Sequence, residues 1–166
     1  MPIRNIWSLE TGEAVTAEVL LENVENCEVY FPVRDVGMDL LVVRGSKHVG
    51  VQVKESRYYL STSGEAGHSW HQLSVKNLRQ KGPDFYVFLT YVPRFGERRV
   101  RTFENRFVIV PAADLERLVV GKSGGKKNVY SFYLSFDGER VTEARDGKAD
   151  YSEYLDRWSL IKKALI

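Results

Sequence analysis

The chain has 166 residues, of which 43% are hydrophobic, which is enough for one packed core and short for two domains. Its 24 Lys and Arg against 22 Asp and Glu leave a net charge of +2, so overall charge indicates no polyanionic partner, and a basic surface would have to come from local clusters. A single cysteine, Cys27, excludes an internal disulfide, and no apolar run approaches the roughly 20 residues of a membrane span, so we expect a cytoplasmic protein with neither a membrane nor a disulfide-linked partner.

Residues 9–26 predict the first helix. Apolar side chains recur there at intervals of three and four residues, which gives a helix one apolar face. They are Ala14, Ala17, Leu20, Leu21 and Val24. Ser8 is a residue type that caps helices, so we expect the helix to begin just after it. Segments rich in valine, leucine and aromatic residues then predict strands. They are residues 27–33, 37–44, 47–56 and 84–92.

The middle of the chain gives a weaker pattern. Residues 57–82 begin as a Gly/Ser-rich loop, and a short helix over residues 71–81 stays one alternative for their end. Residues 93–111 predict a hairpin arm that returns as a strand over residues 106–110. Pro111 then suits the first turn of a following helix.

The last quarter of the chain predicts two strands and a helix. Asp137 and Gly138 have the signature of a hairpin turn between strands. Residues 150–165 predict one final helix, with Asp150 as its cap and Glu153 three residues later. Its apolar stripe consists of Tyr151, Tyr154, Leu155, Trp158, Ile161 and Leu165. The order of helices and strands predicts an α/β or α+β fold in which helices pack on a sheet.

The turn at residues 45–46, Gly-Ser, suits a two-residue hairpin loop of type II′. It pairs Arg44 with Lys47, so cross-strand partners have numbers that sum to 91 and Asp39 faces Gln52. Because side chains alternate along a strand, one face of this hairpin is wholly apolar and is predicted to lie in the core. That face holds Met38, Leu40, Val42, Val49, Val51 and Val53.

The opposite face collects a carboxylate, an amide and an ammonium from Asp39, Gln52 and Lys54. Asp39, with a second oxygen from Gln52 or from the backbone carbonyl of Val53, can hold Mg²⁺ or Mn²⁺, which prefer oxygen ligands. Lys54 can orient an attacking water or stabilise charge that develops on a phosphate. These residues predict metal-assisted phosphodiester cleavage, and the other interpretation is the solvated rim of a sheet.

This pattern resembles the PD-(D/E)xK nuclease superfamily. Residues 37–39, GMD, look like its first element, and residues 52–54, QVK, look like its second, in the Gln variant of relatives of Holliday junction resolvases. The element order over residues 8–92 is similar to the superfamily's common core, within one domain of residues 1–166. The resemblance implies a restriction-endonuclease-like α/β fold, with a mixed central sheet flanked by helices and a C-terminal strand-strand-helix extension.

The resemblance also implies DNA as the substrate, Mg²⁺ or Mn²⁺ as the cofactor, and a homodimer that cuts two strands. The superfamily often adds a glutamate from the preceding helix, for which Glu13 fits best and Glu18 stays an alternative. Glu13 then joins Asp39, Gln52 and the Val53 backbone as metal ligands. Two features depart from the superfamily pattern: the proline before the first acidic residue is absent, and neutral Gln52 lowers the ligand charge and so the metal affinity.

Arginines cluster in the predicted hairpin arm and are the strongest local basic feature, which predicts contacts with nucleic-acid phosphates. They are Arg94, Arg98, Arg99 and Arg101. The other interpretation is an exposed hairpin in which Glu97 and Glu104 neutralise these arginines. Together with the resemblance, these residues predict a metal-dependent DNA endonuclease, with a non-catalytic nucleic-acid- or protein-binding module of the same fold as the alternative.

Several aromatic and histidine side chains have two interpretations. Tyr58, Tyr59 and Trp70 could stack on bases, or pack in the core or at its rim. His68 and His71 bracket Trp70 in a segment expected to lie near the active face. They have no Cys or acidic partner at suitable spacing, so a zinc site is not expected.

Overall fold

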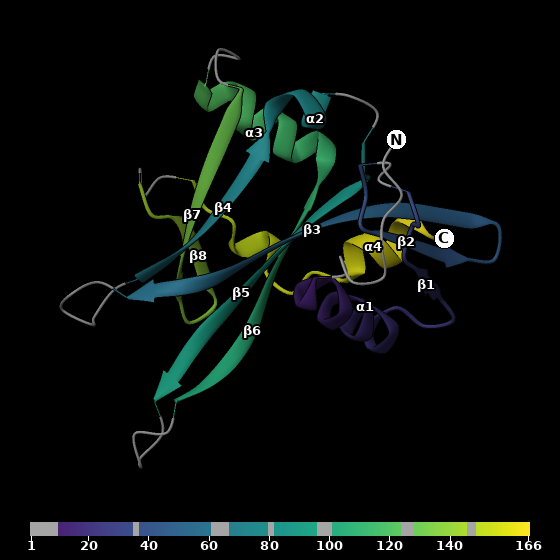
Figure 1. Cartoon of the computed structure of the whole chain (residues 1–166), viewed down its shortest axis with the longest axis horizontal. Helices are drawn as coiled ribbons and strands as arrows, with labels where there is room; N and C mark the ends of the chain where they lie inside the picture. Colours follow the sequence, from purple (N-terminus) through teal and green to yellow (C-terminus); the bar gives the residue numbers. More distant parts are fainter. Residues whose placement is uncertain are drawn as a thin grey trace.

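The computed structural model describes residues 10–34, 37–60, 67–79, 82–95, 101–123, 128–145 and 149–166. In chain order the elements are α1 (Thr11–Asn23), β1 (Glu28–Tyr30), β2 (Leu40–Arg44), β3 (Lys47–Leu60), β4 (Gly67–Ser74), α2 (Val75–Arg79), β5 (Phe85–Phe95), β6 (Arg101–Pro111), α3 (Ala112–Ser123), β7 (Val129–Asp137), β8 (Arg140–Glu143), the 3₁₀ helix η2 (Ser152–Tyr154) and α4 (Ser159–Ala164). The predicted α/β fold, a mixed sheet flanked by helices, is confirmed (Figure 1).

Within the ranges described above, the sheet has eight strands, and it branches at β3. Six strands follow the order β1-β2-β3-β4-β7-β8, and β5 leaves this path to pair with β3 and β6. The β3–β5 pairing is parallel, and the other pairings are antiparallel. The long β3 therefore belongs to both parts of the sheet, with β2 at one end and β4 at the other (Figure 1).

The predicted β2–β3 register is confirmed. Arg44 pairs with Lys47, and the ladder runs to the pair Leu40 and Val51. Gly45 has a φ of +59°, which Ser46 does not share, as a type II′ turn requires. Leu40, Val42, Val49, Val51 and Val53 are all buried on one face, as the alternation predicts.

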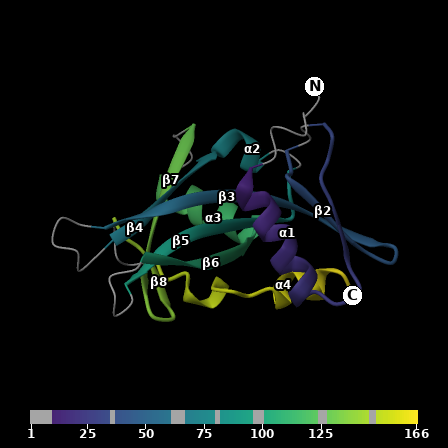
Figure 2. The same cartoon turned by 60° about the horizontal axis from the view of Figure 1, so that its bottom comes forward.

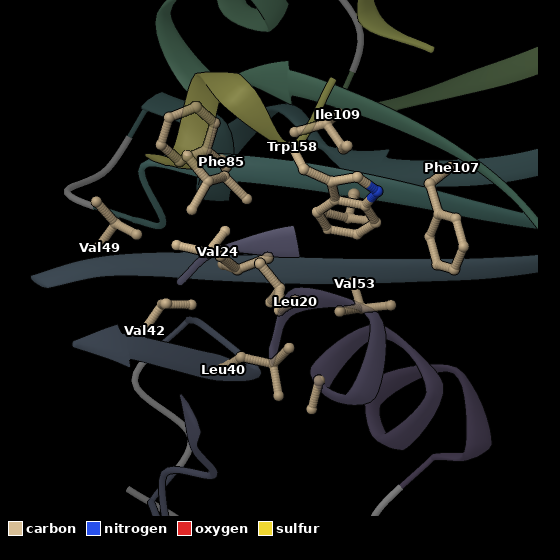
Figure 3. Close-up of a cluster of buried hydrophobic side chains, with 14 of the residues drawn as sticks. Leu20, Val24, Leu40, Val42, Val49, Val53, Phe85, Phe107, Ile109 and Trp158 are labelled. Atoms are coloured by element: carbon tan, nitrogen blue, oxygen red, sulfur yellow. The ribbon is translucent and has the colours of Figure 1, made fainter. Parts of the chain in front are cut away.

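The first core lies between this face of the sheet and helices α1 and α4 (Figure 3). Figure 2 shows α1 lying across the sheet. Leu20 and Val24 enter the core from α1, and Trp158 packs edge-on against Phe107 with ring centroids 5.1 Å apart. Burial of such side chains contributes roughly 1.5–3 kcal/mol each, so this contact layer holds α1 on the sheet.

The buried stripe of α1 differs from the predicted one. Ala14 and Leu21 are exposed, whereas the polar side chains Glu13 and Thr16 are buried. The reason is a close approach at Gly12, where an added Cβ would lie 2.9 Å from the Cβ of Glu55. This contact turns the first turn of the helix toward β3. The N-cap is Glu10, so the prediction of Ser8 as the cap was wrong, and Ser8 itself lies outside the described residues.

The second core lies on the opposite face of the sheet. It joins β5 and β6 to α2, α3, β4, β7, β8 and η2. Its buried members are Leu73, Val75, Leu78, Tyr86, Phe88, Val108, Val110, Leu115, Val119, Phe132, Leu134, Val141, Tyr151, Tyr154 and Leu155. The predicted hairpin at Asp137 and Gly138 is confirmed as the β7–β8 turn, with Gly138 at a φ of +57°.

Two segments differ from prediction. The loop expected from residue 57 holds the end of β3 and all of β4, whereas the short helix left open over residues 71–81 is present as the five-residue α2. The strand character of this loop was hidden because the inward positions of β4 include Gly67, Ser69 and His71, which are not typical core residues. Pro111 is the last residue of β6, and α3 begins directly after it.

The predicted final helix over residues 150–165 is broken into η2 and α4. Between them Leu155 forms a bridge with Val108, and Asp156 adopts a φ of +49° while its N–H donates to the carbonyl of Phe107 at 2.7 Å. The apolar stripe is buried as predicted, but its two halves pack in different cores. Among the described residues, no helix combines the length and apolar character needed to cross a membrane.

Candidate active site at a fork in the sheet

One edge of β3 loses its strand partner in the middle of the sheet. Its pairing with β2 ends at Val51, and its pairing with β4 starts at Tyr58. The other edge pairs with β5 from Val51 to Arg57. Within the part of the chain that the structure describes, the edge of β3 that pairs with β2 therefore has no strand partner over residues 52–57. We call this stretch the fork. Backbone and side-chain groups at the fork are available for other contacts.

Asp39 lies at the fork, directly before β2. Its N–H donates to the carbonyl of Val51 at 2.9 Å. Its Oδ2 accepts a hydrogen bond from the N–H of Val53 at 2.8 Å and another from the side-chain amide of Gln52. The structure therefore brings together Asp39 and Gln52, as the predicted register requires, and places their contact at the end of the β2–β3 ladder.

Met38 departs from the predicted alternation. It was expected in the apolar face, but it is half-buried and outside the first core. Its sulfur lies 3.0 Å from the position that a Cβ on Gly50 would take, so it covers the face that also holds Gln52. The reason is that the backbone N–H of Asp39 donates to the carbonyl of Val51, which is already the partner of Leu40, so the regular alternation ends at Leu40.

Lys54 shares the face of Gln52 because the two residues are two positions apart on one strand. Its neighbour on β5 is Phe88, and the neighbour of Gln52 is Tyr86. Burial raises the pKa of Tyr86, and the carboxylate of Asp39 raises it further. Tyr86 therefore stays neutral, and its ring lies beside the carboxylate of Asp39, a role that the sequence pattern did not indicate.

Glu13 reaches the region from the other side of the sheet. It lies on α1, whose core residues pack on Val51 and Val53. Glu13 is buried and Glu18 is exposed, so the helix directs Glu13 and not Glu18 toward the sheet. Because Gly12 packs on Glu55, the start of α1 lies beside the residue that follows Lys54.

His71 forms part of the inner wall on β4. Its Nε2 lies 3.0 Å from the hydroxyl of Ser69 and 3.3 Å from that of Thr90, and its ring packs edge-on against Phe88. Burial lowers the pKa of His71 to about 3, and the ammonium of Lys54 lowers it as well, against a raising effect of the Lys54 backbone. His71 is thus neutral at physiological pH and packs near Lys54, in a strand rather than in the loop that we had predicted.

Asp84 anchors the start of β5 to β3. Its Oδ2 accepts the N–H of Gly50 at 2.7 Å, its own N–H donates to the carbonyl of Gly50 at 2.8 Å, and its carbonyl accepts the N–H of Ala112. The loop before β5 is therefore tied to the β2–β3 hairpin and to the start of α3. These contacts hold one side of the fork in place.

The predicted basic arm is only partly within the described residues. Arg94 is exposed and forms an ion pair with Glu104, as one of the two interpretations of the arm holds. Glu104 also accepts from Arg106 at 3.1 Å, and although burial raises the pKa of Glu104, the hydrogen bonds from both arginines hold it below its usual value. Arg98, Arg99 and the side chain of Arg101 lie outside the described residues.

Arg106 has a structural role. Its side chain is buried, and it donates to the carbonyl of Gly138 at 2.9 Å and pairs with Glu139 at 3.4 Å. These contacts join β6 to the β7–β8 turn. In the described ranges no three His, Cys, Asp or Glu side chains are grouped so that they could hold a metal ion.

No protein-family model matches this sequence, and no curated protein matches it. Among solved structures, the chain is similar to a bacterial homing endonuclease, I-Ssp6803I. The two share 18% sequence identity and superpose with a TM-score of 0.56, over 97% of this chain and 94% of that chain. This protein therefore shares its fold with that homing endonuclease.

Proposed function

We propose that this protein is an endonuclease of the PD-(D/E)xK superfamily that hydrolyses DNA phosphodiester bonds with Mg²⁺ or Mn²⁺. The observation that carries the proposal is the position of Asp39. Its carboxylate lies against Gln52 and Val53 at the fork, and Lys54 is on the same strand face. The similarity of the fold to that of a homing endonuclease supports the same proposal.

The donor set fits a hard divalent cation. Asp39 offers a carboxylate, and because the N–H and C=O of a strand residue point to the same edge, we expect the Val53 carbonyl to face the fork beside it. Gln52 now donates a side-chain amide N–H to Asp39, and a half-turn of the amide would present its oxygen instead. Bound to these oxygens, Mg²⁺ or Mn²⁺ would supply an acidified water and positive charge near the phosphate.

The remaining chemistry belongs to the side chains. Hydrolysis forms a bond from a water oxygen to phosphorus and breaks the bond to one bridging oxygen, which leaves with a proton. We assign Lys54 to hold the attacking water and to offset the negative charge that grows on the phosphate. Glu13 adds a carboxylate from the start of α1. Phe88 and His71, the neighbours of Lys54, are uncharged, so the charge of Lys54 is weakly screened.

Nicking of supercoiled plasmid tests the proposal. The unaltered protein is expected to nick DNA with Mg²⁺ or Mn²⁺ and to stop when EDTA is added. Asp39→Asn and Lys54→Ala should each lower the rate by about 100-fold or more. Lys47→Ala, a change of an exposed lysine on the same strand, is the matched control and should leave the rate unchanged.

The alternative is a non-catalytic module that binds DNA or a protein. It is favoured by one observation, that no cluster of three acidic, His or Cys ligands is found within the described ranges and that Gln52 is neutral. Under this alternative, DNA binding is unchanged by EDTA, no nicking occurs, and Asp39→Asn has no effect. A homodimer, proposed so that two strands can be cut, predicts twice the monomer mass in sedimentation equilibrium.

A further inference from the structure

Four ring side chains form a row on the outer surface of the sheet beyond the start of α1. We call this row the aromatic platform, and it consists of Tyr59, His68, Trp70 and Tyr133. Tyr59 pairs directly with His68, and Trp70 pairs directly with Tyr133, across three neighbouring strands. Tyr59 is 51% exposed and Trp70 is 46% exposed, so large ring surfaces face solvent.

The rings of the platform are held in contact with one another. Trp70 and Tyr133 are stacked at an interplanar angle of 12°, with centroids 6.4 Å apart. His68 lies between Tyr133, at 5.4 Å, and Tyr59, at 6.4 Å. The backbone N–H of Trp70 donates to the hydroxyl of Ser56 at 3.0 Å, which ties the platform to β3. Tyr58, by contrast, points inward, donates to the carbonyl of Gly67 and packs on Phe136.

Positive charge borders the platform. The guanidinium of Arg145 lies 3.8 Å from the ring centroid of Tyr133, in cation–π geometry, and Arg57 is exposed two residues before Tyr59. Among the described residues, the hollow over the platform is lined by these four rings, none of which is acidic. This combination suits a ligand with flat π surfaces and negative charge.

The platform adjoins the fork, because residues of both line one hollow. An open hollow of about 520 Å³ is lined by Tyr59 and Trp70 of the platform and also by Thr11 of α1 and Glu55 of the fork. Glu55 directly follows Lys54, and Thr11 precedes Glu13 by two residues. The carboxylate of Glu55 is held by the hydroxyl of Tyr91 at 2.9 Å, so its charge is partly engaged within the hollow wall. The hollow therefore extends from the platform to the part of the fork that lies beside the start of α1.

We infer that the aromatic platform stacks unpaired nucleobases of the nucleic acid that the fork cleaves, an inference that rests on the proposed function. Every base offers a π face, whereas the bases of an intact duplex are stacked on one another and cannot reach a flat sheet surface. The platform thus selects substrate with a single-stranded segment beside the cleaved bond. A second copy of this chain fits less well, because polar side chains of Gln72, Ser131 and Thr142 surround the rings on the same face.

The test compares a fluorescent oligothymidylate single strand with a blunt duplex, both bound in EDTA so that no cleavage occurs. Trp70→Ala and Tyr59→Ala are each expected to weaken single-strand binding by about 5- to 100-fold and to change duplex binding by less than about twofold. Trp70→Phe should restore most of the binding. Tyr30→Ala, at a tyrosine of similar exposure on β1, is the control and should change neither affinity.

A second measurement reports stacking directly. The fluorescence of 2-aminopurine in a single strand is expected to fall on binding to the unaltered protein and to stay high with Trp70→Ala. An equal loss of duplex and single-strand binding, or no loss of either, overturns the inference. So does a change from dimer to monomer caused by Trp70→Ala, because the platform would then be an interface between copies.

The outcomes also separate this inference from the proposed function. Nicking by the unaltered protein, together with unchanged single-strand binding in Trp70→Ala, refutes the platform and leaves the endonuclease. Single-strand binding that depends on Trp70, in a protein that nicks neither plasmid nor single strand, refutes the endonuclease and leaves the platform. Oligouridylate in place of oligothymidylate shows whether the bound strand is DNA or RNA.

Discussion

The carboxylate of Asp39 accepts the backbone N–H of Val53 at 2.8 Å, at the point where β2 has ceased to pair with β3. One oxygen thus satisfies a strand donor that would otherwise lack a ladder partner there. The residue that we assign to the metal is for this reason also part of the sheet. Its substitution is expected to affect folding as well as activity, which must be measured separately.

Asp39→Ala is expected to lower the free energy of unfolding by about 1–3 kcal/mol, because it removes a charged acceptor from Val53 and Gln52. Lys54→Ala, on the same strand face, should change it by about 0.5 kcal/mol or less while it removes activity. Urea unfolding of both variants is the measurement. Equal losses in the two variants would show that Asp39 has no special structural role.

Gln52→Glu tests the neutral ligand. A second carboxylate against Asp39 should lower stability in EDTA, because the amide donor is lost and two like charges meet. With Mg²⁺ added, the extra ligand charge should raise metal affinity and restore the melting temperature. Gln72→Glu, at an exposed glutamine of β4, is the control and should show no shift with Mg²⁺. A melting temperature of Gln52→Glu that does not respond to Mg²⁺ would argue against a metal at the fork.

His71 predicts a dependence of stability on pH. Burial holds its pKa at about 3 in the folded protein, against about 6.5 in the unfolded chain. As the pH falls below about 6.5, the unfolded chain takes up the proton first, so stability is complete above that pH and declines toward pH 3. Each unit of difference contributes about 1.4 kcal/mol, so the full loss amounts to a few kcal/mol.

The control for this prediction is His71→Gln, which keeps a polar side chain near Ser69 and Thr90 but cannot titrate. Urea unfolding between pH 7 and pH 4 should show a shallower decline for the variant than for the unaltered protein. Parallel declines would show that another group causes the acid sensitivity.

Local patterns predicted the β2–β3 hairpin and with it the contact of Asp39 and Gln52. A Gly-Ser turn and strict alternation of valines determine the register within twenty residues, without help from the rest of the chain. The fork could not be predicted in the same way, because it depends on where β4 and β5 join β3 from distant parts of the sequence. The inward face of β4 carries Ser69 and His71, so that its strand pattern is polar on both sides.

Long-range contacts also explain the errors in the helices. The last segment has a helical apolar stripe, but the bridge between Leu155 and Val108 breaks it and sends its halves to two cores. In α1, the close approach of Gly12 to Glu55 buries Glu13 where the pattern had placed Ala14. In both cases the periodic pattern correctly predicts helical structure, but tertiary packing decides where the helix is broken or which of its side chains are buried.

Gly12→Ala is expected to disturb α1 and the candidate site together. The added Cβ would lie 2.5 Å from a carboxylate oxygen and 2.9 Å from the Cβ of Glu55, and the second contact cannot be relieved by side-chain rotation. We expect a loss of about 1–3 kcal/mol in unfolding free energy and reduced nicking, because Glu13 moves with the helix. Ala14→Ser, at an exposed neighbour, should change neither value by much. A stability gain in Gly12→Ala would show that the helix shifts freely.

Arg94 and Arg106 are predicted to differ although both pair with Glu104. Arg106 is buried with three partners, so Arg106→Ala should lower the unfolding free energy by roughly 3–5 kcal/mol. Arg94 is 63% exposed, so Arg94→Ala should change stability by about 0.5 kcal/mol or less. If the hairpin arm contacts phosphates, Arg94→Ala should instead reduce the slope of log affinity against log salt by about one, measured with duplex DNA. An unchanged slope would favour the interpretation in which Glu104 neutralises this arginine and the arm does not bind DNA through it.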